Sequence, residues 1–204
     1  MRNRRWLLVF CFCVAVLVLA GSLKAQEFKE NIYDPGKLKP RDSELQVEKG
    51  EQAPDFELPS ISGEMVRLSD YQGQKNVMLS FVPAAWTPVC SDQWPGYDLL
   101  QKEFQARDTV VLGITADNVP TLHAWVQAME GLWFPVLSDF WPHGQAAEKY
   151  GVLRSDGTTE RALFFIDKQG VIRSIHVSDI NRRPKLEKVM QGLRSVQDQD
   201  EGRE

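Results

Sequence analysis

The amino-acid sequence predicts an α/β domain with a mixed central β-sheet, helices on both faces of that sheet and an N-terminal β-hairpin. Three observations support this fold class. Short apolar, β-rich runs alternate with stretches of helical periodicity. Two of these runs flank a helical stretch at a spacing that indicates parallel neighbouring strands. A Lys168-Gln169-Gly170 turn between the last two runs indicates an antiparallel pair.

The first elements are a hairpin and a buried strand. Asp55–Leu58 and Glu64–Leu68 flank a Ser62-Gly63 turn, which predicts the hairpin. Asn76–Val82 is almost continuously apolar, as expected for a central strand that is covered on both faces.

A helix and a second central strand follow. The helix is expected over about Cys90–Arg107, where Pro95 should kink or delay it. The β-rich run Thr109–Thr115 then forms a strand parallel to the first. Asn118 is the expected N-cap of a helix over Val119–Met129.

The remaining elements complete the domain. A short strand is expected over Phe134–Leu137 and a short helix over Gly144–Tyr150. Arg161–Asp167 and Val171–Val177 form the antiparallel pair, and Pro184–Val196 is an amphipathic helix. This order of elements describes a thioredoxin-like fold.

The N-terminus has the pattern of a secretory signal peptide over residues 1–25. Three arginines precede the apolar run Trp6–Ala20, and small residues follow it. Ala20 and Ala25 are both acceptable ends for a cleaved leader. The alternative is an uncleaved membrane anchor, because the run extended to Leu23 is just long enough to span a bilayer. Both interpretations place the domain outside the cytoplasm, in the periplasm or secreted.

Polar segments border the domain, which is expected over residues 48–196. Residues 26–47 contain many charges and prolines, so they are expected to form a flexible lead-in. The tail, 197–204, has no apolar residue and is expected to be disordered.

The charge of the chain argues against two classes of partner. The chain has 24 basic and 28 acidic residues and a net charge of −4. Residues 1–25 hold four of the basic residues and none of the acidic ones, so the remainder carries a net charge of −8. This sign disfavours nucleic acids and anionic membrane surfaces.

Cys90 is the one cysteine outside the apolar N-terminal run. Loss of the leader would remove Cys11 and Cys13, and no internal disulfide could then form. Thr87-Pro88-Val89-Cys90 lacks the first thiol of a Cys-x-x-Cys pair, which excludes a dithiol–disulfide cycle within one chain. A lone thiol in an oxidising compartment is either well hidden or used.

The segment Pro83–Cys90 has the features of a nucleophilic thiolate site. It joins a buried strand to the start of a helix, where the helix N-terminus favours thiolate over thiol. The Thr87 hydroxyl can donate a hydrogen bond to the sulfur or to an oxygen held beside it. Such a thiolate can attack a peroxide oxygen and become a sulfenic acid. The alternative is a small buried cysteine that packs as a hydrophobic residue.

A site of this kind also needs a cation for the thiolate and for the charge that develops on the leaving oxygen. Arg161 is the best candidate, because it begins an apolar strand whose end would lie near the Cys90 loop. Arg154 and Arg173 are alternatives, but their more polar contexts suit surface residues.

The pattern Pro83-x-x-x-Thr87-x-x-Cys90, with Arg161 at the start of a later strand, resembles the active-site signature of the peroxiredoxins. The resemblance extends over about residues 48–192, and Ser138–Gly144 is similar to the one-cysteine, alkyl hydroperoxide reductase E-like branch. It implies a thiol-dependent peroxidase that reduces hydrogen peroxide or organic hydroperoxides without a cofactor.

The resemblance also implies roles for four residues. Cys90 would be the peroxidatic nucleophile, and Arg161 would hold the thiolate and the peroxide oxygens. Thr87 would hydrogen-bond the peroxide, and Pro83 would shield the sulfur from water.

The same resemblance predicts how the oxidised sulfur is reduced. Pro95 stands where some relatives carry a resolving cysteine. An external thiol would therefore complete the cycle: a thioredoxin-like or glutaredoxin-like protein, or a small thiol. A homodimer through the Trp86 loop is a further implication.

A second hypothesis is an exported redox-sensing or binding module without efficient turnover, since the protein lacks an internal resolving thiol. No pair of histidines has the spacing of metal ligands, so His123, His143 and His176 are interpreted as structural or surface groups. The tryptophans at positions 86, 94, 125, 133 and 141 are expected in the core or at an interface.

Overall fold

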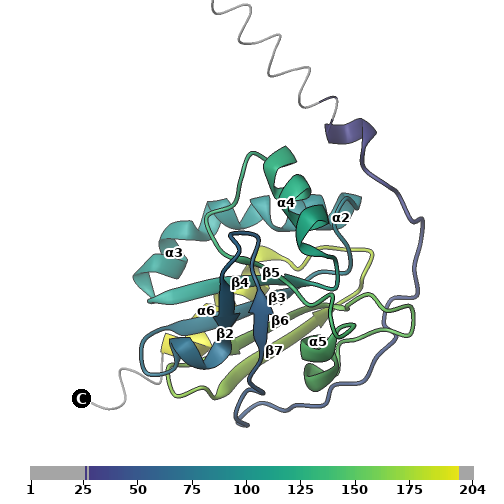
Figure 1. Cartoon of the computed structure of the whole chain (residues 1–204). Coiled ribbons are helices and arrows are strands. Elements are labelled where there is room, and N and C mark those ends of the chain that lie inside the picture. The colour runs from purple at the N-terminus through teal and green to yellow at the C-terminus, as the bar shows by residue number, and fades with distance from the viewer. Residues whose placement is uncertain (1–25, 27, 198–204) are drawn as a thin grey trace, which may run out of the picture. The chain divides into compact units, whose positions relative to one another are not determined.

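The computed structural model describes residue 26 and residues 28–197 (Figure 1). The predicted leader, 1–25, and nearly all of the predicted tail lie outside the described residues. The chain divides into two units, residues 1–33 and 34–204. In the first unit, the described residues include a short helical turn around Lys29. No helix among the described residues is long and apolar enough to span a bilayer.

The second unit is built on a five-stranded mixed sheet with the order β5-β4-β3-β6-β7 (Figure 1). β3, β4 and β5 are parallel to one another, whereas β6 is antiparallel to β3 and to β7. A separate antiparallel hairpin joins β1 and β2. The strands are β1 Glu57–Pro59, β2 Met65–Arg67, β3 Asn76–Phe81, β4 Thr109–Thr115, β5 Val136–Ser138, β6 Arg161–Ile166 and β7 Ile172–Ser178. The predicted mixed sheet, N-terminal hairpin and final antiparallel pair are confirmed.

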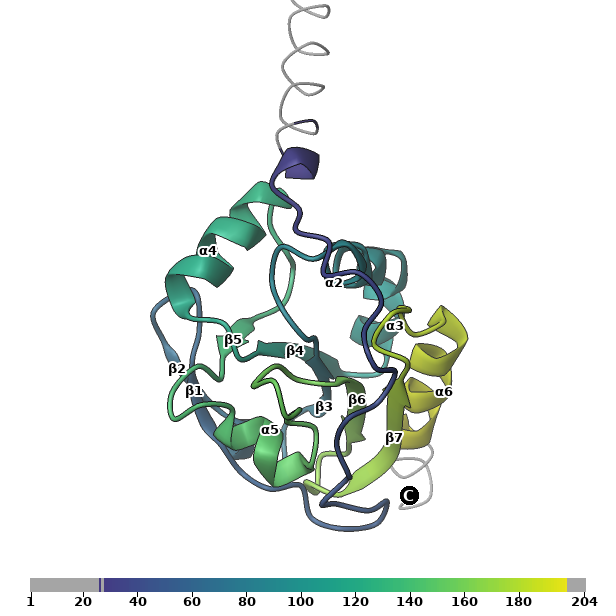
Figure 2. The same ribbon diagram turned by 90° about the vertical axis from the view of Figure 1, so that its right-hand side faces the viewer.

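Helices cover both faces of this sheet, as expected. The helical segments are η1 Leu68–Tyr71, α2 Pro88–Gln93, η2 Pro95–Leu100, α3 Gln101–Ala106, α4 Val119–Ala128, α5 Gln145–Tyr150 and α6 Leu186–Gln197. Figure 2 shows α5 and the β1–β2 hairpin on one side of the sheet and α2, α3 and α6 on the other. Asn118 is the N-cap of α4, because its side chain accepts a hydrogen bond from the Thr121 amide.

The prediction of a single helix over 90–107 is wrong in detail. The segment forms three short pieces, α2, η2 and α3, and the break falls at Trp94-Pro95. Pro95 has no amide hydrogen to continue the α-helical ladder, so the chain continues as a 3₁₀ turn. The prediction that Pro95 would disturb the helix is confirmed, but the full extent of the break was not foreseen.

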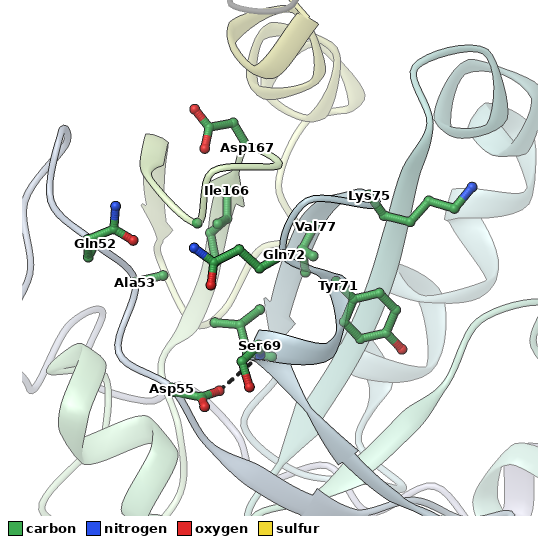
Figure 3. A pocket seen from close by; sticks show the side chains of 12 residues that line it. Gln52, Ala53, Asp55, Ser69, Tyr71, Gln72, Lys75, Val77, Ile166 and Asp167 are labelled. Carbon is green, nitrogen blue, oxygen red and sulfur yellow. Dashed lines mark hydrogen bonds between the residues drawn. The ribbon is translucent and has the colours of Figure 1, made fainter.

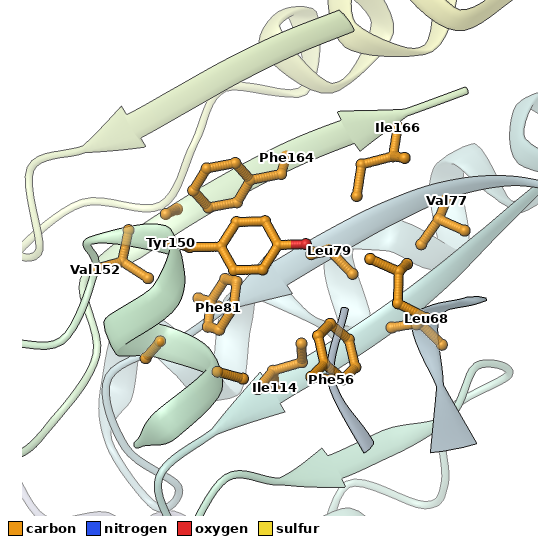
Figure 4. Packing of buried hydrophobic residues seen from close by; sticks show 14 of the residues in the cluster. Phe56, Leu68, Val77, Leu79, Phe81, Ile114, Tyr150, Val152, Phe164 and Ile166 are labelled. Carbon is orange, nitrogen blue, oxygen red and sulfur yellow. The ribbon is translucent and has the colours of Figure 1, made fainter. Parts of the chain in front are cut away.

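One face of the sheet packs around an aromatic group (Figure 4). Phe81 of β3, Phe164 of β6 and Tyr150 of α5 lie with ring centroids 4.8 to 5.8 Å apart. Side chains alternate along a strand, so Val77, Leu79 and Phe81 point into this cluster. Ser80, between Leu79 and Phe81, points to the opposite face, where it contacts Tyr97 and Trp94.

Residues 34–47, here called the strap, are not the flexible lead-in that the sequence predicts. The strap lies on the domain, and the backbone of Leu38 exchanges two hydrogen bonds of 2.8 and 2.9 Å with the side chain of Asn181. It passes so close to Gly151 that a Cβ there would lie 2.2 Å from the Glu44 carbonyl oxygen. The polar composition misled the prediction, because Leu38, Asp42 and Ser43 of the strap have hydrogen-bond partners on the domain.

Candidate active site

The loop between β3 and α2 is fixed by hydrogen bonds to two other segments of the chain. The Ala85 amide donates to the Asp117 carboxylate at 2.8 Å, and the Thr159 hydroxyl donates to the Val82 carbonyl oxygen at 2.8 Å. Trp86 adopts a left-handed conformation, with φ of 59°. Pro83 is buried within this loop. The backbone that leads to Cys90 is therefore held before the helix begins.

Cys90 lies in the first turn of α2 and has no exposed surface. The helix begins after Thr87, its N-cap residue, with Pro88 in the first position. The Thr87 hydroxyl donates to the Ala84 carbonyl oxygen at 2.9 Å, and not to the sulfur. Because a hydroxyl also has two acceptor lone pairs, Thr87 remains able to accept a hydrogen bond from a donor such as a peroxide O–H.

Arg161 lies against Cys90. Its Nη2 atom is 3.4 Å from the Cys90 sulfur, and its side chain is only 2% exposed. Nε and Nη2 both donate to the Ile180 carbonyl oxygen, at 3.1 and 3.0 Å. Nη1 donates to Gln93 Oε1 at 2.7 Å. Four hydrogen bonds thus fix the plane of the guanidinium and direct it at the sulfur.

The charge of Arg161 is not neutralised by a carboxylate in the part of the chain that the structure describes. Its partners are two neutral oxygens and the Cys90 sulfur. A buried cation without an anionic partner is costly, so the site is suited to a group that carries or develops negative charge beside the Cys90 sulfur.

Behind the guanidinium lies a buried polar network. Gln93 accepts from Arg161 and donates through Nε2 to the Tyr97 hydroxyl at 2.8 Å. Tyr97 shares a 3.1 Å hydrogen bond with Ser80, which also accepts from the Trp94 indole at 3.1 Å. Burial raises the pKa of Tyr97, so its hydroxyl keeps its proton at neutral pH. Tyr97 and Ser80 were missed as site residues, because in sequence they read as core positions of a helix and a strand.

The two alternative arginines lie elsewhere. Arg154 was expected at the surface, which is wrong: it is buried and pairs with the fully buried Glu160 at 2.9 Å. Sequence alone did not show that Glu160 points inward. Arg173 pairs with the buried carboxylate of Asp167 at 2.5 Å and remains partly exposed.

The histidines and tryptophans considered in the sequence do not form a second site. No group of three or more possible metal ligands occurs among the described residues. Trp94 and Trp125 are fully buried, with tilted rings whose centroids are 5.1 Å apart, whereas Trp141 is 71% exposed. His123 and His143 are exposed and His176 is partly buried.

A small pocket of about 60 Å³ lies at the opposite end of the sheet (Figure 3). Its lining includes Ile166, the last residue of β6, and Asp167, which follows it, whereas Arg161 is at the start of that strand. Asp167 in this pocket is already paired with Arg173. The pocket is therefore not part of the Cys90 site.

Comparisons with known proteins agree with this geometry. The alkyl hydroperoxide reductase E of Mycobacterium tuberculosis is 38% identical over 125 residues, which are 61% of this chain and 81% of the relative. The chloroplastic 2-Cys peroxiredoxin BAS1 of Arabidopsis thaliana is 34% identical over 158 residues, covering 72% of this chain and 59% of the relative. The solved structure of a reduced 2-Cys peroxiredoxin from Plasmodium vivax has a TM-score of 0.69 at 24% identity, covering 76% of this chain and 84% of that one.

The fold is thioredoxin-like, as it is in these structural neighbours. The profile of the AhpC/TSA family matches residues 49–175, a span that includes the Cys90 loop and Arg161. The protein therefore belongs to the AhpC/TSA family of peroxiredoxins, which are thiol-dependent peroxidases.

Proposed function

We propose that this protein reduces hydrogen peroxide or organic hydroperoxides with Cys90 as its single peroxidatic thiol, and that an external thiol reduces the oxidised sulfur. The observation that carries the proposal is the 3.4 Å contact between Arg161 Nη2 and the Cys90 sulfur. No second cysteine lies in the described part of the chain, so no neighbour there could resolve the sulfur.

The first step is a displacement at oxygen. The Cys90 thiolate attacks one peroxide oxygen, an S–O bond forms and the O–O bond breaks. The leaving oxygen takes a proton and departs as water or an alcohol, while the sulfur becomes a sulfenic acid. The guanidinium of Arg161 stabilises the charge that moves from the sulfur to the leaving oxygen.

Two further residues orient the peroxide in this proposal. The Thr87 hydroxyl donates its own proton to the Ala84 carbonyl oxygen and accepts a hydrogen bond from the peroxide O–H. The buried ring of Pro83 keeps water away from the sulfur. Both roles depend on the fixed loop between β3 and α2.

The second step needs two equivalents of an external thiol. The first attacks the sulfenic acid, releasing water and forming a mixed disulfide with Cys90. The second attacks that disulfide, so that Cys90 returns to the thiol and the reductant leaves as a disulfide. A thioredoxin-like or glutaredoxin-like protein or a small thiol is the proposed reductant.

The experiment compares the wild type with Cys90→Ser and follows both peroxide consumption and tryptophan fluorescence after rapid mixing. Trp94 and Trp125 lie beside α2, and Trp125 donates to the Ser91 hydroxyl next to Cys90 at 3.0 Å, so the fluorescence should report oxidation. Catalytic consumption with a thiol donor, absent in Cys90→Ser, supports the proposal. Consumption of one equivalent without turnover, whatever donor is supplied, would instead favour a redox sensor.

We also propose that the domain acts outside the cytoplasm. The support is the sequence of residues 1–25, where three arginines precede a long apolar run. N-terminal sequencing of the protein recovered from fractionated cells tests this: a mature N-terminus directly after Ala20 or Ala25, or a full-length chain in the membrane, agrees with export. A full-length chain in the cytoplasm would contradict it.

A further inference from the structure

The strap touches the same loop that holds Arg161. The loop after β7 contains Ile180 and Asn181, and Figure 2 shows the strap passing alongside it. The Asn181 side chain accepts from the Leu38 amide at 2.8 Å and donates to the Leu38 carbonyl oxygen at 2.9 Å. One residue earlier, the Ile180 amide donates to the Pro40 carbonyl oxygen at 3.2 Å. Three hydrogen bonds thus join strap and loop.

Ile180 connects this contact directly to the active site. Its amide faces the strap, and its carbonyl oxygen accepts both Nε and Nη2 of Arg161. The Ile180 side chain is buried, so the residue is held in one place. Ile180 therefore accepts from Arg161 through its carbonyl oxygen and is held by the strap through its amide.

A second contact attaches the strap near Arg161. The Asp42 amide donates to Glu160 at 2.5 Å, and the Asp42 carboxylate accepts from the Ser155 amide at 3.0 Å. Glu160 immediately precedes Arg161 and pairs with Arg154, which also donates to the Lys39 carbonyl oxygen at 3.1 Å. The strap is thereby bound on both sides of the start of β6.

We propose that the strap is a positioning element for Arg161: residues 38–42 hold the Ile180 carbonyl oxygen and the start of β6 so that the guanidinium is directed at the Cys90 sulfur. This inference rests on the proposed peroxidase function, which it deepens. Leu38 and Asp42 are only partly buried and the residues between them are exposed, so these residues are held mainly by hydrogen bonds and not by core packing. Loosening the strap should therefore affect Arg161 before it affects the fold.

The test uses three variants of the full chain. Asn181→Ala removes both side-chain bonds to Leu38, and Asp42→Ala removes the independent attachment at Ser155. Arg41→Ala is the matched control, because the Arg41 side chain lies on the strap but donates only to Ser43 within it. Thermal unfolding of each variant establishes that it is folded.

Two readouts separate positioning from a merely structural role. The first is hydrogen exchange of the Arg161 Nε–H by NMR, which reports the bond to Ile180 whether or not the protein reacts with peroxide. The second is the rate constant for oxidation of Cys90 by hydrogen peroxide, measured apart from the later reaction with the thiol. Asn181→Ala and Asp42→Ala should speed the exchange and slow oxidation about fivefold without slowing the thiol step.

Arg41→Ala should leave both rates as in the wild type. If the two strap variants are folded and either rate is unchanged, or if Arg41→Ala has the same effects, the inference is wrong. If the wild type itself does not react with peroxide, the proposed function fails, and the exchange of the Arg161 Nε–H alone decides whether the strap holds that side chain.

Discussion

The guanidinium of Arg161 lies 3.4 Å from the sulfur of Cys90, although 71 positions separate the two residues in the chain. The register of the sheet brings them together. β6 is antiparallel to β3, with Ala162 opposite Phe81, so the start of β6 lies beside the end of β3 from which the Cys90 loop departs. A shift of one residue in this register would turn Arg161 to the other face of the sheet.

The first prediction concerns the geometry of Arg161. Arg161→Lys keeps a positive charge but loses the planar fork that contacts Ile180, Gln93 and Cys90 together. We expect the rate constant for oxidation by hydrogen peroxide to fall by roughly two orders of magnitude, as for other removed donors to a developing oxyanion. Rapid mixing with fluorescence detection measures it.

The control for this change is Arg194→Gln, since Arg194 is exposed on α6. It should leave the oxidation rate within about twofold, because exposed charges far from a site contribute little. An Arg161→Lys protein that reacts as fast as the wild type would show that the fork is not needed.

The second prediction separates the members of the buried network. Gln93→Met removes the acceptor of Arg161 Nη1 and the donor to Tyr97, whereas Tyr97→Phe leaves the bond between Gln93 and Arg161 intact. Each change should lower the free energy of unfolding by about 1–3 kcal/mol, the cost of unpaired buried polar groups. Only Gln93→Met should slow oxidation strongly. Equal slowing in both variants would contradict the assignment of Gln93 as the residue that orients Arg161.

The third prediction concerns pH. Hydrogen bonds from Lys39 and from Ser155 hold the pKa of Asp42 well below its ordinary value. A carboxylate with a lowered pKa stabilises the folded state above its ordinary pKa and loses that contribution as the pH falls through the lowered value. The attachment of the strap at Ser155 should therefore weaken only in strongly acidic solution.

Amide exchange of Ser155 measures this attachment, because its amide donates to the Asp42 carboxylate. In Asp42→Asn the protection of this amide, relative to the exchange of a free amide at the same pH, should be lower at neutral pH and should show no acid-dependent step. The same acid profile in Asp42→Asn and in the wild type would rule out Asp42 as the titrating group.

The fourth prediction tests the packing of α6 on the sheet. A Cβ at Gly192 would lie 2.1 Å from the ring of Phe165, so helix and strand can approach only with glycine there. Gly192→Ala should lower the free energy of unfolding by about 2 kcal/mol. Denaturant titration is the measurement, and Gln191→Ala, on the exposed face of the same helix, should change it by less than about 0.5 kcal/mol. A fully stable Gly192→Ala protein would contradict the close approach.

Local patterns predicted much of this structure. The apolar runs fixed the strands, and Arg161 was found because an arginine opens an otherwise apolar strand. Contacts between residues that are far apart in the sequence were harder to predict. The sequence around Arg154 is typical of a surface residue, because it does not show that Glu160 points inward. The strap has the composition of a flexible segment, because the sequence does not show that Asn181 accepts a hydrogen bond from it and that Ser155 donates one to it. A polar sequence does not show whether its partners are water or protein.

Mass spectrometry of the Cys90 peptide after one equivalent of hydrogen peroxide, with and without a thiol donor, tests most directly whether Cys90 is the reacting thiol. If Cys90 is the peroxidatic thiol, it gains one oxygen, which a specific reagent traps as a sulfenic acid, and it loses that oxygen when the thiol is added. An unmodified Cys90 in the sample without thiol, after the peroxide has been consumed, would show that Cys90 is not the group that reacts.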